Sequence, residues 1–213
     1  MGLQVRFLFQ FGNISSVAPA WFPVRGAWEE VGGKEAVQTV KMVITGAVAA
    51  GKTEFIKAIS EIDVISTERK ATDETSLIKK ETTVAMDFGR IAIADDLVLH
   101  LFGTPGQKRF DFMWEILSEG MLGLVVLVDS TRPDTFRETA RIIEFFTAYR
   151  KTPYIIACNK QDLENAWTPQ DIRYSLRVPE IIKVIPCTAK DKEQVKKVLL
   201  ELLYTILEDA EED

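Results

Sequence analysis

Apolar runs and amphipathic stretches alternate through most of this chain. The run Leu124-Val125-Val126-Leu127-Val128 is apolar at every position, which is typical of a strand covered on both faces of a sheet. From Asp191 to about Glu208, apolar residues recur every three or four positions, which predicts a helix with one buried face. The residues on that face are Val195, Val198, Leu199, Leu202, Leu203 and Ile206.

Further runs predict strands at 40–45, 97–102, 154–158 and 184–187, and helical stretches lie at 54–60, 111–119 and 134–149. Thr168 and Pro169 open a short helix as cap and first residue. A run at 83–94 precedes the 97–102 strand, and Asp95-Asp96 between them predicts a hairpin turn. Strands that alternate with helices indicate an α/β fold, a mostly parallel sheet covered on both faces.

A glycine-rich segment follows the first strand and precedes the first helix. It fits G-x-x-x-x-G-K-[ST], in which successive backbone N–H groups close around phosphate oxygens. Lys52 would bring its charge to the outer phosphates, and the Thr53 hydroxyl would bind Mg²⁺. The alternative is a small-residue turn that binds nothing. The predicted phosphate-binding residues are Gly46, Ala47, Val48, Ala49, Ala50, Gly51, Lys52 and Thr53.

A second motif, Asn159-Lys160-Gln161-Asp162, follows a predicted buried strand and fits N-K-x-D. The Asp162 carboxylate can accept hydrogen bonds from guanine N1–H and the 2-amino group, whereas adenine has no such pair of donors. Asn159 would brace neighbouring loops, and the Lys160 stem would lie along the base. After the next strand, Thr188-Ala189-Lys190 resembles an S-A-K element whose backbone N–H contacts guanine O6. An ATP-dependent kinase is disfavoured by this motif.

Together these motifs resemble the Ras-like small GTPases over residues 39–208. The segment from Phe102 to Phe110, with Thr104-Pro105-Gly106-Gln107 at its centre, is similar to the prokaryotic branch that includes MglA-type proteins. The resemblance implies a three-layer P-loop NTPase fold (G domain), with a six-stranded, mostly parallel sheet, one antiparallel strand and about five helices. It also implies GTP and GDP as ligands, Mg²⁺ as cofactor and a regulatory protein, with a Roadblock-domain protein as candidate partner.

The resemblance assigns roles to residues in two switch segments. Thr83 matches the threonine that binds Mg²⁺ and senses the γ-phosphate, with Thr82 as the alternative. Gly106 matches the glycine whose N–H meets the γ-phosphate. Gln107 matches the glutamine that orients the attacking water, so Gln107 and Lys52 are the predicted catalytic residues.

Two positions depart from the family pattern. Gly103 stands where the family has an aspartate near Mg²⁺, and Asp87 or Asp129 is the candidate substitute. Val48 stands where a glycine is usual, and its branched side chain would crowd the γ-phosphate and an incoming arginine. We therefore expect slow hydrolysis, with a pseudo-GTPase that binds without hydrolysing as the alternative. Cations that could act within the chain are Arg69, Lys79, Lys80 and Arg109.

Composition narrows the partners and the location. With 213 residues, a net charge of −6 and a pI near 5.1, the chain is not expected to bind nucleic acid. Apolar runs fall short of the about 20 residues that span a bilayer. Arg6 disfavours myristoylation of Gly2, and a C-terminal prenylation cysteine is absent, so we expect no lipid anchor. Cys158 and Cys187 lie in apolar runs and are expected to be reduced, in a cytoplasmic protein.

The two ends differ from the core. Residues 1–38 are rich in aromatics, proline and glycine, and we expect a poorly ordered extension, with docking of its aromatics as the alternative. Ala18-Pro19-Ala20 resembles a signal-peptide cleavage site, but Gln10, Gly12 and Asn13 interrupt the apolar stretch before it. We expect residues 209–213 to form an acidic tail, a solvated and frayed end of the last helix.

Overall fold

A computed structural model describes residues 38–66, 86–94, 97–106, 112–149 and 152–212. The predicted turn at Asp95-Asp96, the switch residues Thr82, Thr83 and Gln107, and the extension before Gln38 lie outside the described residues.

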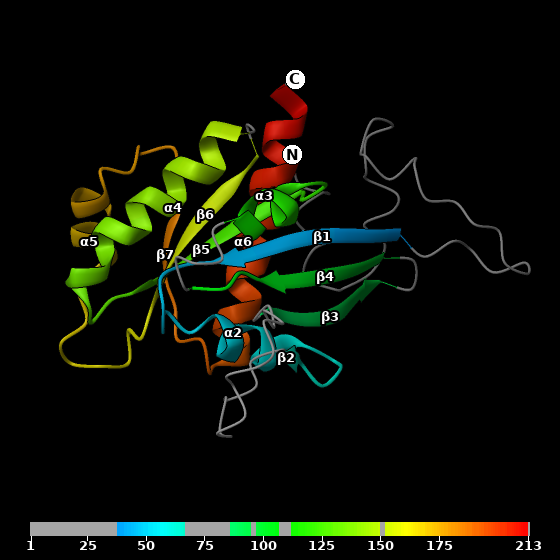
Figure 1. Ribbon diagram of the computed structural model, residues 1–213, viewed down its shortest axis with the longest axis horizontal. Helices are drawn as coiled ribbons and strands as arrows, with labels where there is room; N and C mark the ends of the chain where they lie inside the picture. The colour runs from blue at the N-terminus through cyan, green and yellow to red at the C-terminus, as the bar shows by residue number, and fades with distance from the viewer. Residues whose placement is uncertain (1–37, 67–85, 95–96, 107–111, 150–151, 213) are drawn as a thin grey trace, which may run out of the picture.

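The described strands form one sheet in the order β2-β3-β4-β1-β5-β6-β7 (Figure 1). Neighbours from β4 to β7 are parallel, and β3 is antiparallel to both β4 and β2. The six predicted strands are all present, and a two-residue strand, β2, adds a seventh at the edge. Two residues carry no periodic pattern, which is why the sequence did not predict β2. The bounds are β1 (Gln38–Thr45), β2 (Ile65–Ser66), β3 (Asp87–Ala94), β4 (Leu97–Gly103), β5 (Gly123–Asp129), β6 (Tyr154–Asn159) and β7 (Val184–Pro186).

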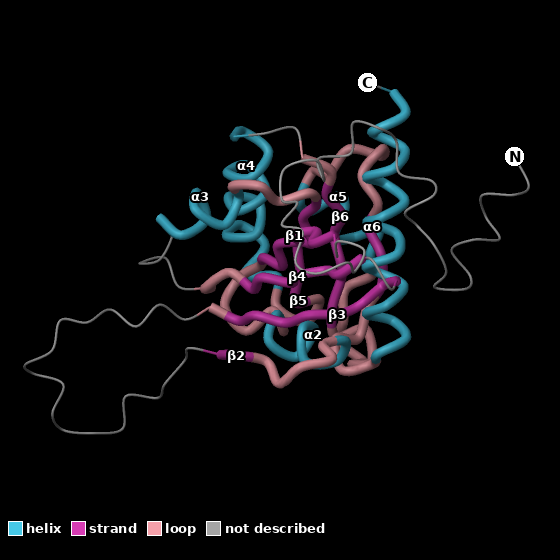
Figure 2. Tube along the Cα trace, turned by 90° about the vertical axis from the view of Figure 1, so that its right-hand side faces the viewer, coloured by secondary structure: helices cyan, strands magenta, loops and turns pink. Residues whose placement is uncertain are grey.

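Helices cover both faces of this sheet, which confirms the predicted three-layer α/β fold (Figures 1 and 2). On one face lie α2 (Lys52–Ile59) and α6 (Lys192–Glu212), and they share a single buried core with the strands. On the other face lie α3 (Phe112–Ser118), α4 (Phe136–Tyr149) and α5 (Pro169–Leu176). A short 3₁₀ helix, η4 (Pro133–Thr135), precedes α4.

The central strands divide their side chains between the two cores. In β1, Met42 and Ile44 pack toward α2 and α6, whereas Val43 packs toward α3 and α4, as the period of two along a strand requires. All residues of β5 are buried, as its apolar sequence predicted. Strands β1, β5 and β6 are parallel neighbours, so their carboxyl ends lie at the same edge of the sheet. The loops that follow these ends form the candidate site.

Helix α6 is longer than the sequence predicted. The six apolar residues of its predicted face are all buried, but the helix continues through Glu212 rather than ending near Glu208. No glycine or proline interrupts the chain there, and Ala210 is itself buried, so the segment expected to be a frayed tail is part of the helix as far as Glu212. None of the helices in the described ranges is long and apolar enough to cross a membrane.

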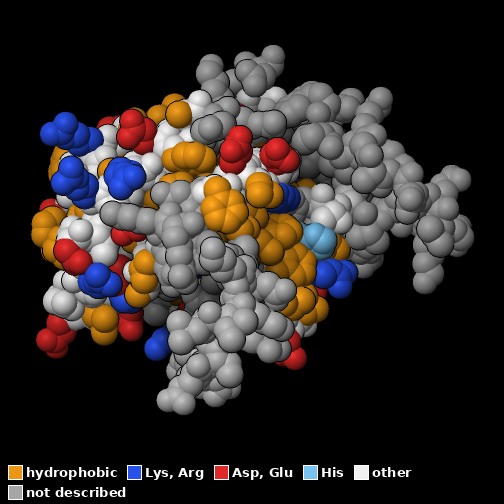
Figure 3. All heavy atoms as spheres, in the orientation of Figure 1, with side chains coloured by type: hydrophobic (Ala, Val, Ile, Leu, Met, Phe, Trp, Pro, Cys, Tyr) orange, Lys and Arg blue, Asp and Glu red, His pale blue; other side chains and the backbone are white. Residues whose placement is uncertain are grey.

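A half-buried aromatic cluster lies on the sheet face near its β3 edge. His100 packs edge-on against Phe88, with ring centroids 5.2 Å apart, and Phe102 lies 5.1 Å from Phe88. Burial and the nearby Arg90 charge lower the pKa of His100. Figure 3 shows hydrophobic side chains gathered beside the single histidine on the face toward the viewer. His100 is thus a packed side chain of the sheet face.

Both cysteines are free and buried, on opposite faces of the sheet. Cys158 belongs to the core under α3, α4 and α5, and Cys187 to the core under α2 and α6. Burial raises the pKa of each thiol to about 12.

Candidate nucleotide-binding site

The loop between β1 and α2 has a backbone that only glycine can adopt at its two ends. Gly46 has φ of 147°, and a Cβ there would lie 2.2 Å from the carbonyl oxygen of Leu127. Gly51 has φ of 102°, and a Cβ there would lie 2.3 Å from Asn159 Nδ2. Positive φ at Gly46, Ala49 and Gly51 curls the loop around the start of α2, and a side chain at either glycine would collide with Leu127 or Asn159. The first residues of a helix present free N–H groups, which suit an anion.

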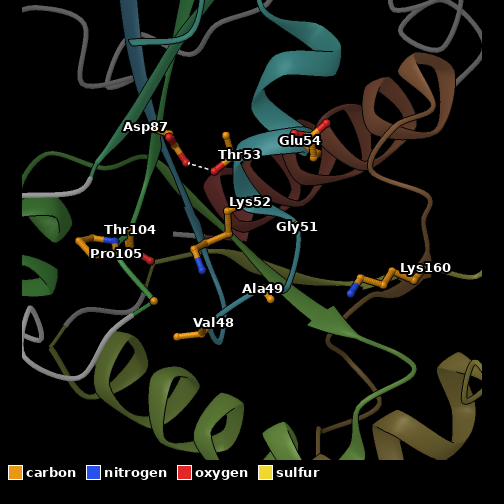
Figure 4. A pocket seen from close by; sticks show the side chains of 11 residues that line it. Val48, Ala49, Gly51, Lys52, Thr53, Glu54, Asp87, Thr104, Pro105 and Lys160 are labelled. Atoms are coloured by element: carbon orange, nitrogen blue, oxygen red, sulfur yellow. Dashed lines mark hydrogen bonds between the residues drawn. The ribbon is translucent and has the colours of Figure 1, made fainter. Parts of the chain in front are cut away.

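Lys52 is the first residue of α2, and its amine points back across the loop. Its Nζ donates hydrogen bonds of 2.7 Å to the Gly46 carbonyl and 2.9 Å to the Ala47 carbonyl. The side chain is only 8% exposed. Figure 4 shows the amine in the space between Val48 and Thr104. A positive charge is therefore held where the loop would enclose phosphate.

A cavity of about 460 Å³ opens beside this amine. Gly106 closes one side of it, so tightly that a Cβ at this position would lie 2.9 Å from Val48 Cα and 3.0 Å from Lys52 Nζ. Thr104 lies two residues before this glycine. A hydrogen bond of 2.9 Å between its hydroxyl and that of Thr45 fixes it to β1. The sequence analysis missed this threonine pair. The lining residues are Val48, Ala49, Gly51, Lys52, Thr53, Glu54, Asp87, Thr104, Pro105, Gly106 and Lys160.

The predicted metal ligand Thr53 is paired with a carboxylate. Its Oγ1 donates a hydrogen bond of 2.5 Å to Asp87 Oδ2, drawn as the dashed line in Figure 4. Asp87 begins β3 and lies directly opposite Gly103 of β4. Of the two substitutes that the sequence left open for the missing aspartate, Asp87 is the one that contacts Thr53.

Asp129, the other substitute, has a different partner. Lys160 Nζ donates to Asp129 Oδ2 at 2.5 Å, and the Thr131 hydroxyl donates to Oδ1 at 2.7 Å. Burial alone would raise the pKa of Asp129, but these hydrogen bonds outweigh it and hold the pKa below its usual value. Asp129 thus fixes the Lys160 stem, which lines the cavity on the side of Ala49 (Figure 4).

Asn159 joins three loops that are far apart in the sequence. Its Nδ2 donates to the Ala50 carbonyl at 2.7 Å, and its Oδ1 accepts from the backbone N–H of Ala189 at 2.8 Å and of Lys160 at 2.7 Å. The side chain is 3% exposed, so these bonds are shielded from water. The phosphate loop and the two predicted base-binding loops are therefore held in one fixed arrangement.

The remaining predicted base-binding residues do not line the cavity, and of these Ala189 contacts Asn159. Ala189 is buried with its N–H on Asn159, and Thr188 is half-buried. Asp162 and Lys190 are exposed, so their side chains are open to a ligand. The structure thus brings together the phosphate loop, Gly106, Asn159, Lys160 and Ala189, whereas Thr83 and Gln107 lie outside the described residues.

The fold and these loops define a Ras-like P-loop nucleotide-binding protein. A solved structure with the same fold is the Arl6 small GTPase of Trypanosoma brucei with a bound nucleotide analogue, GppNp, at a TM-score of 0.61 and 16% identity. That match covers 80% of this chain and 99% of the other.

The chain is also similar to curated proteins. The chain is 27% identical over 160 residues to the mutual gliding-motility protein MglA of Myxococcus xanthus, covering 68% of this chain and 81% of MglA. It is 36% identical over 124 residues to the uncharacterized protein MJ1339 of Methanocaldococcus jannaschii, covering 58% of this chain and 71% of the relative. The chain belongs to the family described as "Conserved hypothetical ATP binding protein", whose model matches residues 44–211.

Proposed function

We propose that this protein is a molecular switch that binds GTP and hydrolyses it to GDP and phosphate. The observation that carries the proposal is the set of hydrogen bonds made by Asn159. They connect the phosphate loop at Ala50 to two further loops, one that begins at Lys160 and one that contains Ala189 and Lys190. A phosphate chain at Lys52 would then place its base beside those two loops.

Guanine is favoured over adenine by Asp162. Its exposed carboxylate can accept two hydrogen bonds from guanine, and adenine would leave it unpaired. The family's description names ATP, so the choice of base is the first point to test.

For hydrolysis, water attacks the γ-phosphorus and the bond from this phosphorus to the β–γ bridging oxygen breaks. The electron pair of that bond stays on GDP, and the oxygen and protons of the water leave with the phosphate. Lys52 and the N–H groups of the phosphate loop would stabilise that charge, and Gln107 would orient the water. Bound Mg²⁺ would supply further charge neutralisation on the phosphate oxygens. The Thr53 hydroxyl and the Asp87 carboxylate are hard oxygen donors on one side of the cavity, and they fit this ion.

The switch would work through residues 104–106. Gly106 lies against Val48 and Lys52, so the presence or loss of a γ-phosphate there would move this segment and the α3 helix that follows. A regulatory protein in the cytoplasm, for which a Roadblock-domain protein is the candidate, would bind this segment in one nucleotide state and not in the other.

Equilibrium binding of fluorescent GDP, GTP and ATP to the purified protein tests the class of ligand. Lys52→Ala should weaken GDP binding about 100-fold or more, because the amine next to the phosphates is lost. Lys57→Ala is the matched control, since this lysine lies on the same helix and is exposed. Unchanged GDP affinity in Lys52→Ala would show that Lys52 does not bind the phosphates.

The base is tested by Asp162→Asn. This variant should lose preference for GTP and gain preference for xanthosine triphosphate, whose 2-oxo group needs a donor from the protein. Glu164→Gln changes an exposed carboxylate of the same turn and should leave the preference unmoved. Tighter binding of ATP than GTP by the wild type would contradict the proposal.

A second candidate is a pseudo-GTPase that binds guanine nucleotide without significant hydrolysis. It is favoured by Val48, whose side chain is 48% exposed at the cavity beside Gly106, where the attacking water would enter. Single-turnover hydrolysis of bound GTP separates the two, since the first candidate requires a slow rate that depends on Gln107.

A further inference from the structure

Strand β3 lies at an edge of the sheet that is only partly closed by another strand. Among the described strands, β3 has β4 on one side and the two-residue β2 on the other (Figure 1). Strand β2 pairs with Asp87 and Phe88 alone, although β3 continues to Ala94. A strand edge without a partner offers its backbone N–H and C=O groups to a strand of another chain. The part of β3 beyond Phe88 therefore needs another cover.

The turn that follows α2 occupies this edge in place of a strand. The backbone N–H of Glu61 donates to the Arg90 carbonyl at 2.8 Å, and the Glu61 carboxylate accepts from the N–H of Ala92 at 3.0 Å. The Ser60 hydroxyl oxygen accepts from the N–H of Arg90 at 3.2 Å and donates its own proton to the Ile62 carbonyl at 2.8 Å. Both backbone groups of Arg90 and the N–H of Ala92 are thus paired within the chain.

Glycine at position 89 lets the turn lie this close to the strand. A Cβ on Gly89 would lie 2.4 Å from Ile56 Cγ2 and 3.2 Å from the Cβ and the Oγ of Ser60. The turn is also joined to α2, because the N–H of Ser60 donates to the Ile56 carbonyl at 2.9 Å. Any side chain at position 89 would therefore push the end of α2 and the turn away from β3.

We infer that the turn at 60–62 is a plug that keeps β3 from pairing with the β3 strand of a second copy of this chain. Two identical strand edges can pair antiparallel about a two-fold axis, so a second copy presents a matching edge whenever the turn is displaced. Glu61 contributes two of the bonds to β3, one from its backbone and one from its carboxylate. The inference concerns the sheet edge and does not depend on the proposed binding of GTP and GDP.

Sedimentation velocity at increasing protein concentration tests the plug. Glu61→Ala leaves the N–H of Ala92 without its acceptor, and should tighten self-association about tenfold or more relative to the wild type. Gly89→Ala displaces the turn without changing any charge and should have the same effect. Asp63→Ala is the matched control for Glu61→Ala, because it removes an exposed carboxylate two residues away. It should associate no more than the wild type, although both variants lose one negative charge.

Ala92→Pro asks whether the association uses the strand edge. Proline has no N–H, and an edge strand tolerates it where the N–H faces outward. Added to Glu61→Ala, it should return the protein to the monomer, with cooperative urea unfolding as the check that the double variant is folded. Amide hydrogen exchange gives a second measurement at the same atom. In dilute Glu61→Ala, the N–H of Ala92 should exchange about tenfold faster than in the wild type.

Equal self-association of the wild type, Glu61→Ala and Gly89→Ala overturns the inference. Association of Glu61→Ala that persists in a folded Ala92→Pro double variant also overturns it, since the contact then lies elsewhere. A wild type that is dimeric and becomes monomeric on Ala92→Pro would show that the edge is already open, which is the opposite of a plug.

Discussion

The side-chain amide of Asn159 donates a 2.7 Å hydrogen bond to the carbonyl oxygen of Ala50, which lies 109 residues earlier in the chain. The same side chain accepts a bond from the backbone of Ala189, so one buried residue connects the ends of β1, β6 and β7. Its removal takes away the partner of the Ala50 carbonyl and of the N–H groups of Ala189 and Lys160, where water has little access.

Asn159→Ala should therefore lower the free energy of unfolding of the nucleotide-free protein by roughly 2–4 kcal/mol. Urea unfolding followed by circular dichroism measures this. Asn165→Ala, in an exposed turn, is the control and should change it by less than about 0.5 kcal/mol. Equal stabilities for the two variants would mean that the Asn159 bonds contribute nothing.

Gly46 and Gly120 allow steric conflict to be separated from backbone strain. Both have positive φ, but a Cβ on Gly46 meets the Leu127 carbonyl at 2.2 Å, whereas a Cβ on Gly120 meets nothing within 4 Å. Gly120→Ala should cost about 1–2 kcal/mol from the left-handed backbone alone. Gly46→Ala should cost about 3 kcal/mol or more, because the backbone of β5 must move as well. Thermal unfolding of both variants measures the difference, and similar melting temperatures would contradict the close approach.

Val48 is expected to limit hydrolysis. Val48→Gly removes the branched side chain beside Gly106 and should raise single-turnover GTP hydrolysis about tenfold, equivalent to ~1.4 kcal/mol of barrier. Gln107→Leu in the same background should abolish the gain while leaving GTP affinity unchanged, since Gln107 is assigned to the water rather than to binding. A Val48→Gly rate equal to that of the wild type would show that the Val48 side chain does not limit hydrolysis.

Because of the two buried thiols, the free energy of unfolding should depend on pH in the alkaline range. Their pKa values are raised by burial to about 12 in the folded state, against 9.0 for an exposed thiol. The unfolded chain thus loses these protons first, so the stability is complete below pH 9 and is lost as the pH rises toward 12. Each thiol should contribute a slope of about 1.4 kcal/mol per pH unit in that range.

Urea unfolding between pH 8 and about pH 10.5 measures that slope. The variant Cys158→Ala/Cys187→Ala is the control, because it keeps Tyr154, whose pKa burial also raises. Parallel pH profiles for wild type and variant would show that the thiols are not the cause.

The order and type of the main elements could be predicted from the sequence because their signals are local. The unbroken apolar run of β5 indicates a strand buried on both faces, and the three-to-four spacing in α6 indicates a helix with one buried face. The phosphate loop is likewise one contiguous segment whose glycines can be read directly. The end of α6 was misplaced, because acidic residues after Glu208 are compatible with either a tail or a helix and only the burial of Ala210 decides.

The relation between Asp87 and Gly103 could not be predicted, because it depends on the register of two antiparallel strands. A shift of one residue would turn Asp87 to the opposite face of the sheet. The sequence therefore left Asp87 and Asp129 as equal candidates, and the contacts to Thr53 and Lys160 distinguish them. The bond between Thr45 and Thr104 is similarly a product of tertiary packing between two ordinary threonines.

The three-way contact at Asn159 also has a consequence for synthesis on the ribosome. The phosphate loop is made before Asn159 and Ala189, which follow it by more than a hundred residues, and the core under α2 needs α6, which follows all of the described strands. A nascent chain that ends before Asn159 lacks the side chain that fixes the phosphate loop, and one that ends before Ala189 lacks the third loop of the contact. Retention of guanine nucleotide by ribosome-bound chains of increasing length should therefore begin abruptly once α6 has left the ribosome, so that shorter chains stay outside the nucleotide cycle.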